Sequence, residues 1–158
     1  MSKIIAIVNQ KGGVGKTTTA VNLSAAIADM GYKTLLIDID PQANTCLGIG
    51  ISRWDMNKGI YDLLIGDANV NEVIMKTYKD NLYIIPSDSD LVGAQIELVS
   101  EIGREFKLKK AIESIKNDYE YILIDCPPTL GILTLNALTA ADSVLIPIQC
   151  EFYALDGV

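Results

Sequence analysis

Five apolar runs of strand length recur along this 158-residue chain, with helical patterns between them. The runs are rich in β-branched residues and do not alternate with polar residues, which is typical of parallel strands buried on both faces. Strands that alternate with long helical crossovers predict an α/β fold, namely a doubly wound, mainly parallel sheet with helices on both faces and ligands at the carboxyl ends of the strands. The predicted strands are residues 3–8, 33–38, 82–87, 121–126 and 143–148.

Three segments between these runs predict helices, at residues 15–31, 105–116 and 131–142. In the first two, apolar side chains recur at helical spacing and define the face that should pack on the sheet. Those side chains are Ala20, Leu23, Ile27 and Met30 in the first helix, and Leu108, Ile112 and Ile115 in the second.

Two parts of the chain do not follow this pattern. Residues 41–81 mix four glycines with short helical pieces, so we expect a mobile or partner-facing insertion rather than core. The last ten residues stop where a further helix begins, directly after the last strand. We therefore expect residues 1–158 to form a single domain whose C-terminal part is missing.

Composition excludes several classes of protein. The formal net charge of −7 argues against a broad nucleic-acid patch within these residues. The chain has no histidine, which excludes Ser-His-Asp triads, histidine general bases and HExxH metal sites. Cys46, Cys126 and Cys150 form no CxxC pair, so we interpret them as buried apolar residues. No run is long enough to span a bilayer and no signal peptide is visible, so we expect a cytoplasmic protein.

A glycine-rich loop, "GGVGKT" at residues 12–17, follows the first predicted strand and opens the first predicted helix. In that context the backbone N–H groups of the loop and of the helix start point at bound phosphates. The Lys16 ammonium would meet the β- and γ-phosphates, and the Thr17 hydroxyl would bind Mg²⁺. The alternative is a glycine-rich turn with an incidental lysine. The predicted nucleotide-binding residues are Lys11, Gly12, Gly13, Val14, Gly15, Lys16, Thr17 and Thr18.

This loop departs from the usual phosphate-loop pattern, which opens with glycine at the position of Gln10. A second lysine, Lys11, stands at its outer edge, where the ammonium could reach phosphates across a subunit boundary. Spacing alone favours the alternative of a solvated surface lysine.

Asp38 and Asp40 end the second predicted strand and lie two residues apart, hence on one face. Carboxylates at the carboxyl end of a strand in this fold lie beside the phosphate site. One of them can hold a water in line with the γ-phosphate or bind the metal through water. The alternative is a pair of aspartates that cap the turn before Pro41.

Another apolar strand ends in Asp125, whose carboxylate would hold Mg²⁺ through a water molecule. The loop that follows contains Pro127, Pro128 and Gly131, a restricted backbone suited to sensing the γ-phosphate. The alternative is an aspartate that only caps the end of the strand.

These motifs together resemble a known family. "KGGVGKTT" (11–18) is similar to the deviant Walker A motif, "DIDPQAN" (38–44) to Walker A′ and "YILIDCPP" (121–128) to Walker B of ParA/Soj-type chromosome and plasmid partition ATPases in the ParA/MinD superfamily. "GAQIELV" (93–99) and "IPIQCEFYAL" (146–155) also resemble its chromosomal Soj branch.

The resemblance implies a P-loop ATPase that binds ATP and Mg²⁺, hydrolyses ATP slowly to ADP and phosphate, and forms an ATP-sandwich homodimer. Lys11 would then cross to the nucleotide of the partner subunit, Lys16 and Thr17 would hold phosphates and Mg²⁺, and Asp40 would be needed for hydrolysis. The resemblance further implies a ParB-type activating protein, and nonspecific DNA binding with nucleoid association for the full-length protein. It implies no membrane partner.

Three other functions remain open at this point. A MinD-like, membrane-associated regulator of division-site placement shares the fold and Lys11, but it needs a C-terminal amphipathic helix beyond Val158. An iron–sulfur reductase needs two cluster cysteines near the dimer axis, and Cys126 directly follows Asp125, where burial is expected. A scaffold with an inactive phosphate loop is disfavoured, because Lys16, Thr17, Asp40 and Asp125 are all present.

Overall fold

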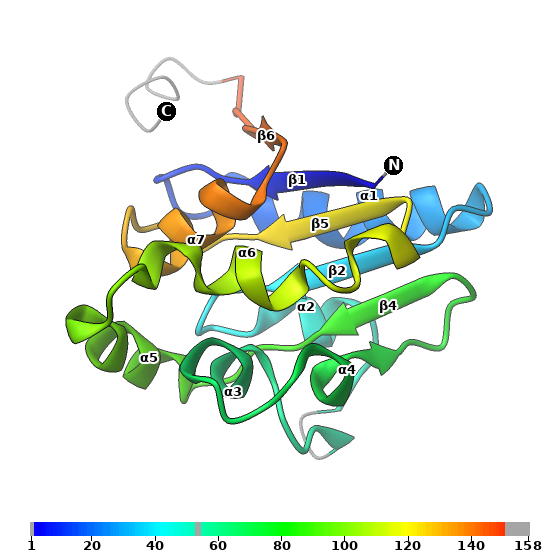
Figure 1. Cartoon of the computed structure of the whole chain (residues 1–158). Helices are drawn as coiled ribbons and strands as arrows, with labels where there is room; N and C mark the ends of the chain where they lie inside the picture. Colours follow the sequence, from blue (N-terminus) through cyan, green and yellow to red (C-terminus); the bar gives the residue numbers. More distant parts are fainter. Residues whose placement is uncertain (1, 53–54, 151–158) are drawn as a thin grey trace.

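The computed structural model describes residues 2–52 and 55–150. The strands are β1 (Lys3–Ile7), β2 (Thr34–Asp38), β3 (Met75–Lys76), β4 (Leu82–Ile85), β5 (Tyr121–Asp125) and β6 (Ser143–Leu145). They form one six-stranded sheet in the order β3-β4-β2-β5-β1-β6 (Figure 1). All neighbours pair in parallel except β3 and β4, which confirms the predicted mainly parallel α/β sheet.

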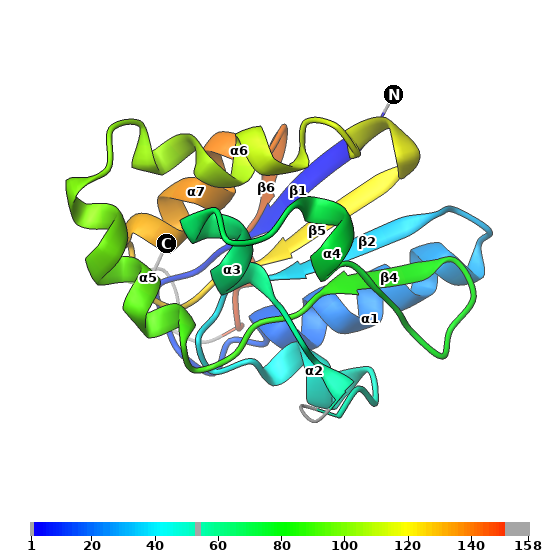
Figure 2. The same ribbon diagram turned by 60° about the horizontal axis from the view of Figure 1, so that its bottom comes forward.

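Helices lie on both faces of this sheet. The α-helices are α1 (Lys16–Asp29), α2 (Asn44–Gly48), α3 (Ile60–Ile65), α4 (Val70–Val73), α5 (Leu91–Glu97), α6 (Lys107–Ile112) and α7 (Ile132–Ala140). Short 3₁₀ turns are η2 (Leu98–Ser100), η3 (Arg104–Phe106) and η4 (Lys116–Asp118). Figure 2 shows α1 and α2 on one side of the sheet and α3 to α7 on the other.

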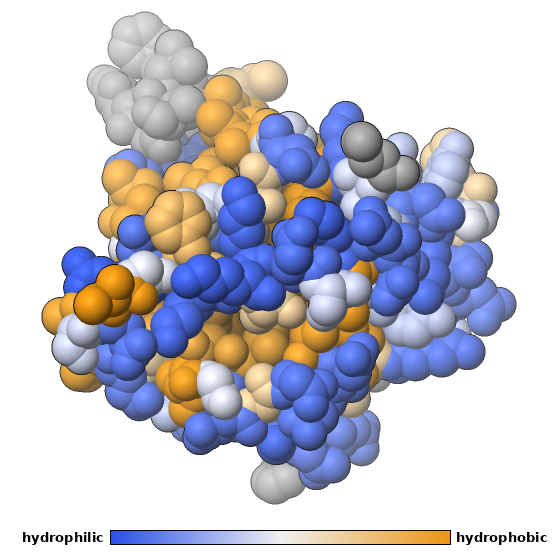
Figure 3. All heavy atoms as spheres, in the orientation of Figure 1, coloured by the Kyte–Doolittle hydropathy of each residue, from blue (hydrophilic) through white to orange (hydrophobic). Residues whose placement is uncertain are grey.

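Alternate residues of the central strands belong to two separate hydrophobic cores, one on each face of the sheet. In β2, Leu35 and Ile37 pack with α3 to α7, whereas Leu36 packs against α1 and α2. Because helices cover both faces, successive strand residues are all buried, which explains the unbroken apolar runs. Figure 3 shows hydrophobic side chains at the surface in the region between α3 and α6, bordered by hydrophilic residues.

The face that α1 buries agrees with the predicted one at Ala20, Leu23 and Ile27 and differs from it at Met30. Its fully buried positions are Ala20, Ser24 and Ala28, whereas Met30 is 73% exposed. Small side chains at i, i+4 and i+8 let the helix approach the sheet closely, and Leu23 and Ile27 flank the contact half-buried. In α6 and the residues after it the prediction is confirmed, because the buried side chains are Leu108, Ile112 and Ile115.

The expectation that residues 41–81 are not core is wrong. Cys46 of α2 lies in the core beside α1, and Ile60 and Leu64 of α3 lie in the larger core. The helices here have four to six residues, too few for a periodic pattern to show in the sequence. Local bonds define them instead, since the Gly59 N–H donates to the Asp62 carboxylate at 2.8 Å at the start of α3.

The edges of the sheet hold the remaining differences. The antiparallel strand β3 has two residues and was not predicted. The helix expected to begin near the end of the chain falls largely on residues 151–158, outside the described residues. Within residues 2–52 and 55–150, no helix combines the length and apolarity that crossing a bilayer requires.

Candidate functional site

The loop between β1 and α1 has the backbone of a phosphate-binding turn. Gly13 and Gly15 adopt φ values of 75° and 89°, a left-handed region that favours glycine. Helix α1 starts directly after Gly15 with no side-chain cap and no acidic residue in its first turn. The N–H groups of that first turn are therefore available, with the positive end of the helix dipole, to an anion.

This loop forms one wall of a pocket of about 340 Å³ at the carboxyl ends of the parallel strands. The loop after β2, the start of α2 and the loop after β5 also contribute residues to its lining. The pocket is lined by Gly12, Gly13, Gly15, Lys16, Thr17, Thr18, Asp40, Gln42, Asn44 and Pro128. The structure thus brings most of the predicted nucleotide-binding residues together with Asp40, whereas Lys11, Val14 and Asp125 do not line the pocket.

The two lysines of the loop lie in different surroundings. Lys16 is 8% exposed, and its Nζ donates to the backbone carbonyl of Lys11 at 3.1 Å. The backbone N–H of Lys11 donates to the Asn9 side chain at 2.8 Å, while the Lys11 side chain is half-buried outside the pocket lining. Only Lys16 is therefore held at the pocket within one subunit.

Asp125 ends β5 as a buried carboxylate, 1% exposed, in register with Asp38 on β2. Neither of its oxygens has a partner of hydrogen-bond distance and angle among the described residues. Burial, and next the charge of Asp38, raise the pKa of Asp125 to about 7, while the nearby Thr17 hydroxyl and Lys16 charge act in the opposite direction.

A buried carboxylate without a partner next to an uncapped helix start fits a cation bound with an anion. Mg²⁺ in nucleotide sites takes few protein oxygens, because phosphates and water fill most of its shell. Among the described residues, no group of three or more His, Cys, Asp or Glu side chains lies close enough together to hold a metal ion. Thr17 and Asp125 supply oxygen donors that suit Mg²⁺.

Asp38 is not part of the pocket lining, contrary to its predicted pairing with Asp40 on one face. Its carboxylate turns into the loop after β2 and accepts N–H groups from Asp40 at 2.9 Å and Thr45 at 3.3 Å, as well as the Thr45 hydroxyl. Burial raises the pKa of Asp38 to about 6, although these hydrogen bonds oppose the change.

Sequence reasoning missed two residues of the pocket, Gln42 and Asn44. Gln42 and Asn44 follow Asp40 on the same loop, and the Gln42 N–H donates to the Asp40 carboxylate at 2.9 Å. The signal available in the sequence was that the motif "DIDPQAN" continues past Asp40 to Asn44. Pro128 belongs to the restricted loop after Asp125 that was singled out as a γ-phosphate sensor.

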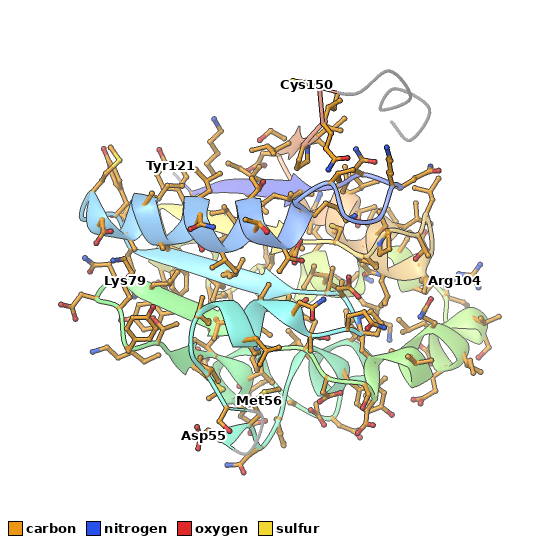
Figure 4. All side chains as sticks on the ribbon, turned by 180° about the vertical axis from the view of Figure 1, so that it is seen from behind. Asp55, Met56, Lys79, Arg104, Tyr121 and Cys150 are labelled. Atoms are coloured by element: carbon orange, nitrogen blue, oxygen red, sulfur yellow. The ribbon has the colours of Figure 1, made fainter. Side chains whose placement is uncertain are left out.

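The cysteines do not gather at any site. Cys126 is buried at the end of β5, and Cys46 is buried beside Met56, at a sulfur–sulfur distance of 4.0 Å. Cys150 is exposed, so the expectation of burial is wrong for it. Figure 4 shows Cys150 and Met56 at opposite sides of the molecule. This separation gives no support to a cluster-binding site within one chain.

Known proteins are similar to this chain over all or nearly all of its length. A family model described as an AAA domain matches residues 2–158. The sporulation initiation inhibitor protein Soj of Bacillus subtilis is 58% identical over 158 residues, covering 100% of this chain and 62% of Soj. The chromosome partitioning protein ParA of Myxococcus xanthus is 51% identical and is covered to 56%. The chain therefore spans 56–62% of the length of these relatives.

Solved structures share the fold. A cobyrinic acid a,c-diamide synthase from Mycobacterium smegmatis with bound ADP and magnesium superposes with a TM-score of 0.95 at 39% identity, covering 100% of this chain and 64% of that one. The septum site-determining protein MinD of Pyrococcus horikoshii with Mg-ADP gives 0.84 at 36% identity, covering 99% and 61%. The chain therefore belongs to the AAA domain family, and its similarity to Soj and ParA over its whole length confirms the resemblance that its three motifs predicted.

Proposed function

We propose that the protein is a ParA/Soj-type partition ATPase that binds Mg-ATP in the 340 Å³ pocket and hydrolyses it to ADP and phosphate. The observation that carries the proposal is the uncapped start of α1 beside the buried, unpartnered carboxylate of Asp125. An anion-binding helix end and a carboxylate in need of a cation together suit a polyphosphate with Mg²⁺. The nucleotides in related structures support this reading.

The roles proposed for binding follow the positions of the side chains. Backbone N–H groups of residues 12–18 would contact the phosphates, and the Lys16 ammonium would exchange its bond to the Lys11 carbonyl for the β- and γ-phosphates. The Thr17 hydroxyl and, through water, the Asp125 carboxylate would hold Mg²⁺. The chemistry that Mg²⁺ supplies there is neutralisation of phosphate charge.

The role proposed for Asp40 is to orient the attacking water toward the γ-phosphate. Asp40 lines the same pocket as Lys16 and Thr17. The chain has no histidine that could act as a general base. Catalysis would therefore rest on positioning the attacking water and neutralising phosphate charge, which suits slow intrinsic hydrolysis. Pro128, on the pocket wall, would report the γ-phosphate to the loop that follows β5.

Lys11 is proposed to act on a second subunit. Its side chain lies outside the pocket of its own chain, which suits a contact with the nucleotide of the partner subunit in an ATP-sandwich homodimer. We further propose that a ParB-type partner stimulates hydrolysis, and that the full-length dimer binds DNA nonspecifically on the nucleoid. Similarity to Soj and ParA supports these assignments.

A MinD-like, membrane-associated function is less well supported. Identity to Soj and ParA relatives is 51–58%, against 36% to the solved MinD structures. The loop "DPQAN" after β2, which supplies Asp40, Gln42 and Asn44 to the pocket, also favours the partition branch.

Light scattering on a sizing column tests the proposal. Asp40→Ala should bind ATP without hydrolysing it. Its mass should therefore double when Mg-ATP is added, because the dimer forms, and should remain that of a monomer with Mg-ADP. Lys11→Ala in the same background should bind ATP and remain a monomer. An ATP-dependent dimer in the Lys11→Ala protein would refute the cross-subunit role, and a monomer in both would refute the sandwich dimer.

A further inference from the structure

Asn44, the first residue of α2, lines the pocket together with Asp40 and Gln42 of the loop between β2 and α2. The backbone of this loop includes Ala43 at φ 54°, ψ 40°, fully buried and directly before α2. Residues other than glycine rarely adopt this left-handed conformation, and they keep it only where surrounding interactions enforce it. The loop therefore needs a fixed restraint to keep the conformation that places Asp40.

That restraint comes from one buried carboxylate. Oδ1 of Asp38 accepts the Asp40 N–H at 2.9 Å, and Oδ2 accepts the Thr45 N–H at 3.3 Å together with the Thr45 hydroxyl. Asp38 and Thr45 are both fully buried. Both ends of the loop are thus tied to the same side chain, at a site that water does not reach.

Asp40 depends on this arrangement for its own position. Its N–H is one of the groups bound by Asp38, and its carboxylate accepts the N–H of Gln42, two residues further along the same loop, at 2.9 Å. Its backbone carbonyl accepts the Ala43 N–H at 2.9 Å. The contacts that orient Asp40 therefore lie within the loop that Asp38 and Thr45 close, so a shift of the loop moves the carboxylate with it.

From this geometry we infer that Thr45 is a positioning residue for the water-orienting Asp40, and that it acts through its buried hydrogen bond to Asp38. The inference rests on the proposed ATPase function and adds a residue that contacts neither nucleotide nor metal in that proposal. It predicts that loss of the Thr45 hydroxyl lowers turnover while the phosphate loop continues to bind ATP.

Thr45→Val removes the hydroxyl and keeps the branched shape, and Thr45→Ser restores the hydroxyl. Thr34→Val is the matched control, because Thr34 is fully buried at the opposite end of β2 and donates its hydroxyl to the Tyr32 carbonyl at 2.9 Å. Two quantities are measured on each folded protein. They are kcat and KM for Mg-ATP hydrolysis, and the hydrogen-exchange rate of the Asp40 amide in the nucleotide-free protein.

Misplacing a catalytic group by about 1 Å can cost up to about 100-fold in rate. For Thr45→Val we therefore expect kcat to fall by about 10- to 100-fold with KM changed less than about threefold. The Asp40 amide should exchange at least about tenfold faster. Thr45→Ser should recover both quantities, and Thr34→Val should change neither, even where its unfolding midpoint falls.

Unchanged exchange of the Asp40 amide in Thr45→Val would overturn the inference, whatever the activity. An equal loss of kcat in Thr34→Val would also overturn it, because general destabilisation would then explain the effect. If the wild-type protein hydrolyses no ATP, the proposed function fails, and the exchange measurement still decides whether Thr45 holds Asp40 in place.

Discussion

The buried carboxylate of Asp125 should weaken the ligand-free fold at neutral pH. Burial raises its pKa from the ordinary value of 3.8 to about 7. Between these values the folded protein holds a proton that the unfolded chain has released, so stability falls as the pH rises through this window. About three pKa units at about 1.4 kcal/mol each set an upper limit of about 4 kcal/mol for this loss.

Asp125→Asn removes the charge and keeps the shape of the side chain. At about pH 8 the variant should be more stable than the wild type by about 2–4 kcal/mol, because it has no carboxylate to desolvate. On lowering the pH to about 5, the wild type should gain roughly 3 kcal/mol and so approach the variant. A smaller slope should remain in the variant, because the pKa of Asp38 is also raised, to about 6.

Urea unfolding in the presence of a chelator, at about pH 5 and pH 8, measures these differences. Asp118→Asn is the control, since Asp118 is exposed and its loss should leave the pH dependence of stability as in the wild type. The reasoning is refuted if Asp125→Asn is no more stable than the wild type at pH 8, or if the wild type is more stable at pH 8 than at pH 5.

Two further substitutions probe the loop and the core by urea unfolding. Gly15→Ala should cost about 1–2 kcal/mol, since φ is 89° and no atom lies within 4 Å of the added methyl, whereas Gly12→Ala, without a positive φ, should cost less than about 0.5 kcal/mol; equal effects would contradict the backbone argument. Leu64→Ala should cost about 2–5 kcal/mol because Leu64 is fully buried, against less than about 0.5 kcal/mol for Leu47→Ala at 72% exposure. A Leu64→Ala effect as small as that of Leu47→Ala would contradict the finding that residues 41–81 contribute to the core.

The central sheet could be predicted from the sequence because strands that are buried on both faces appear as unbroken apolar runs. In β5, Ile122 and Ile124 face one core and Leu123 faces the other, so the strand contains no polar position before Asp125. The phosphate loop could also be predicted from the sequence, because the left-handed backbone at position 15 favours glycine and Lys16 follows it directly.

Features that depend on how elements meet could not be predicted in the same way. The buried face of α1 is set by the small residues Ala20, Ser24 and Ala28, whose hydrophobicity gives little signal. The bond between Asp38 and Thr45 depends on a loop that passes through a left-handed alanine, which no propensity favours. For the same reason the sequence placed Asp38 beside Asp40, although the structure turns it into the loop.

Binding of Mg-ATP to the protein, measured by isothermal titration calorimetry, tests the central claim most directly. We expect one Mg-ATP per chain for the wild type and for Lys110→Ala, an exposed lysine on α6, and no detectable binding for Lys16→Ala. Affinity retained in Lys16→Ala, or none in the wild type, would contradict the assignment of the pocket between the glycine-rich loop and Asp40 as the nucleotide site.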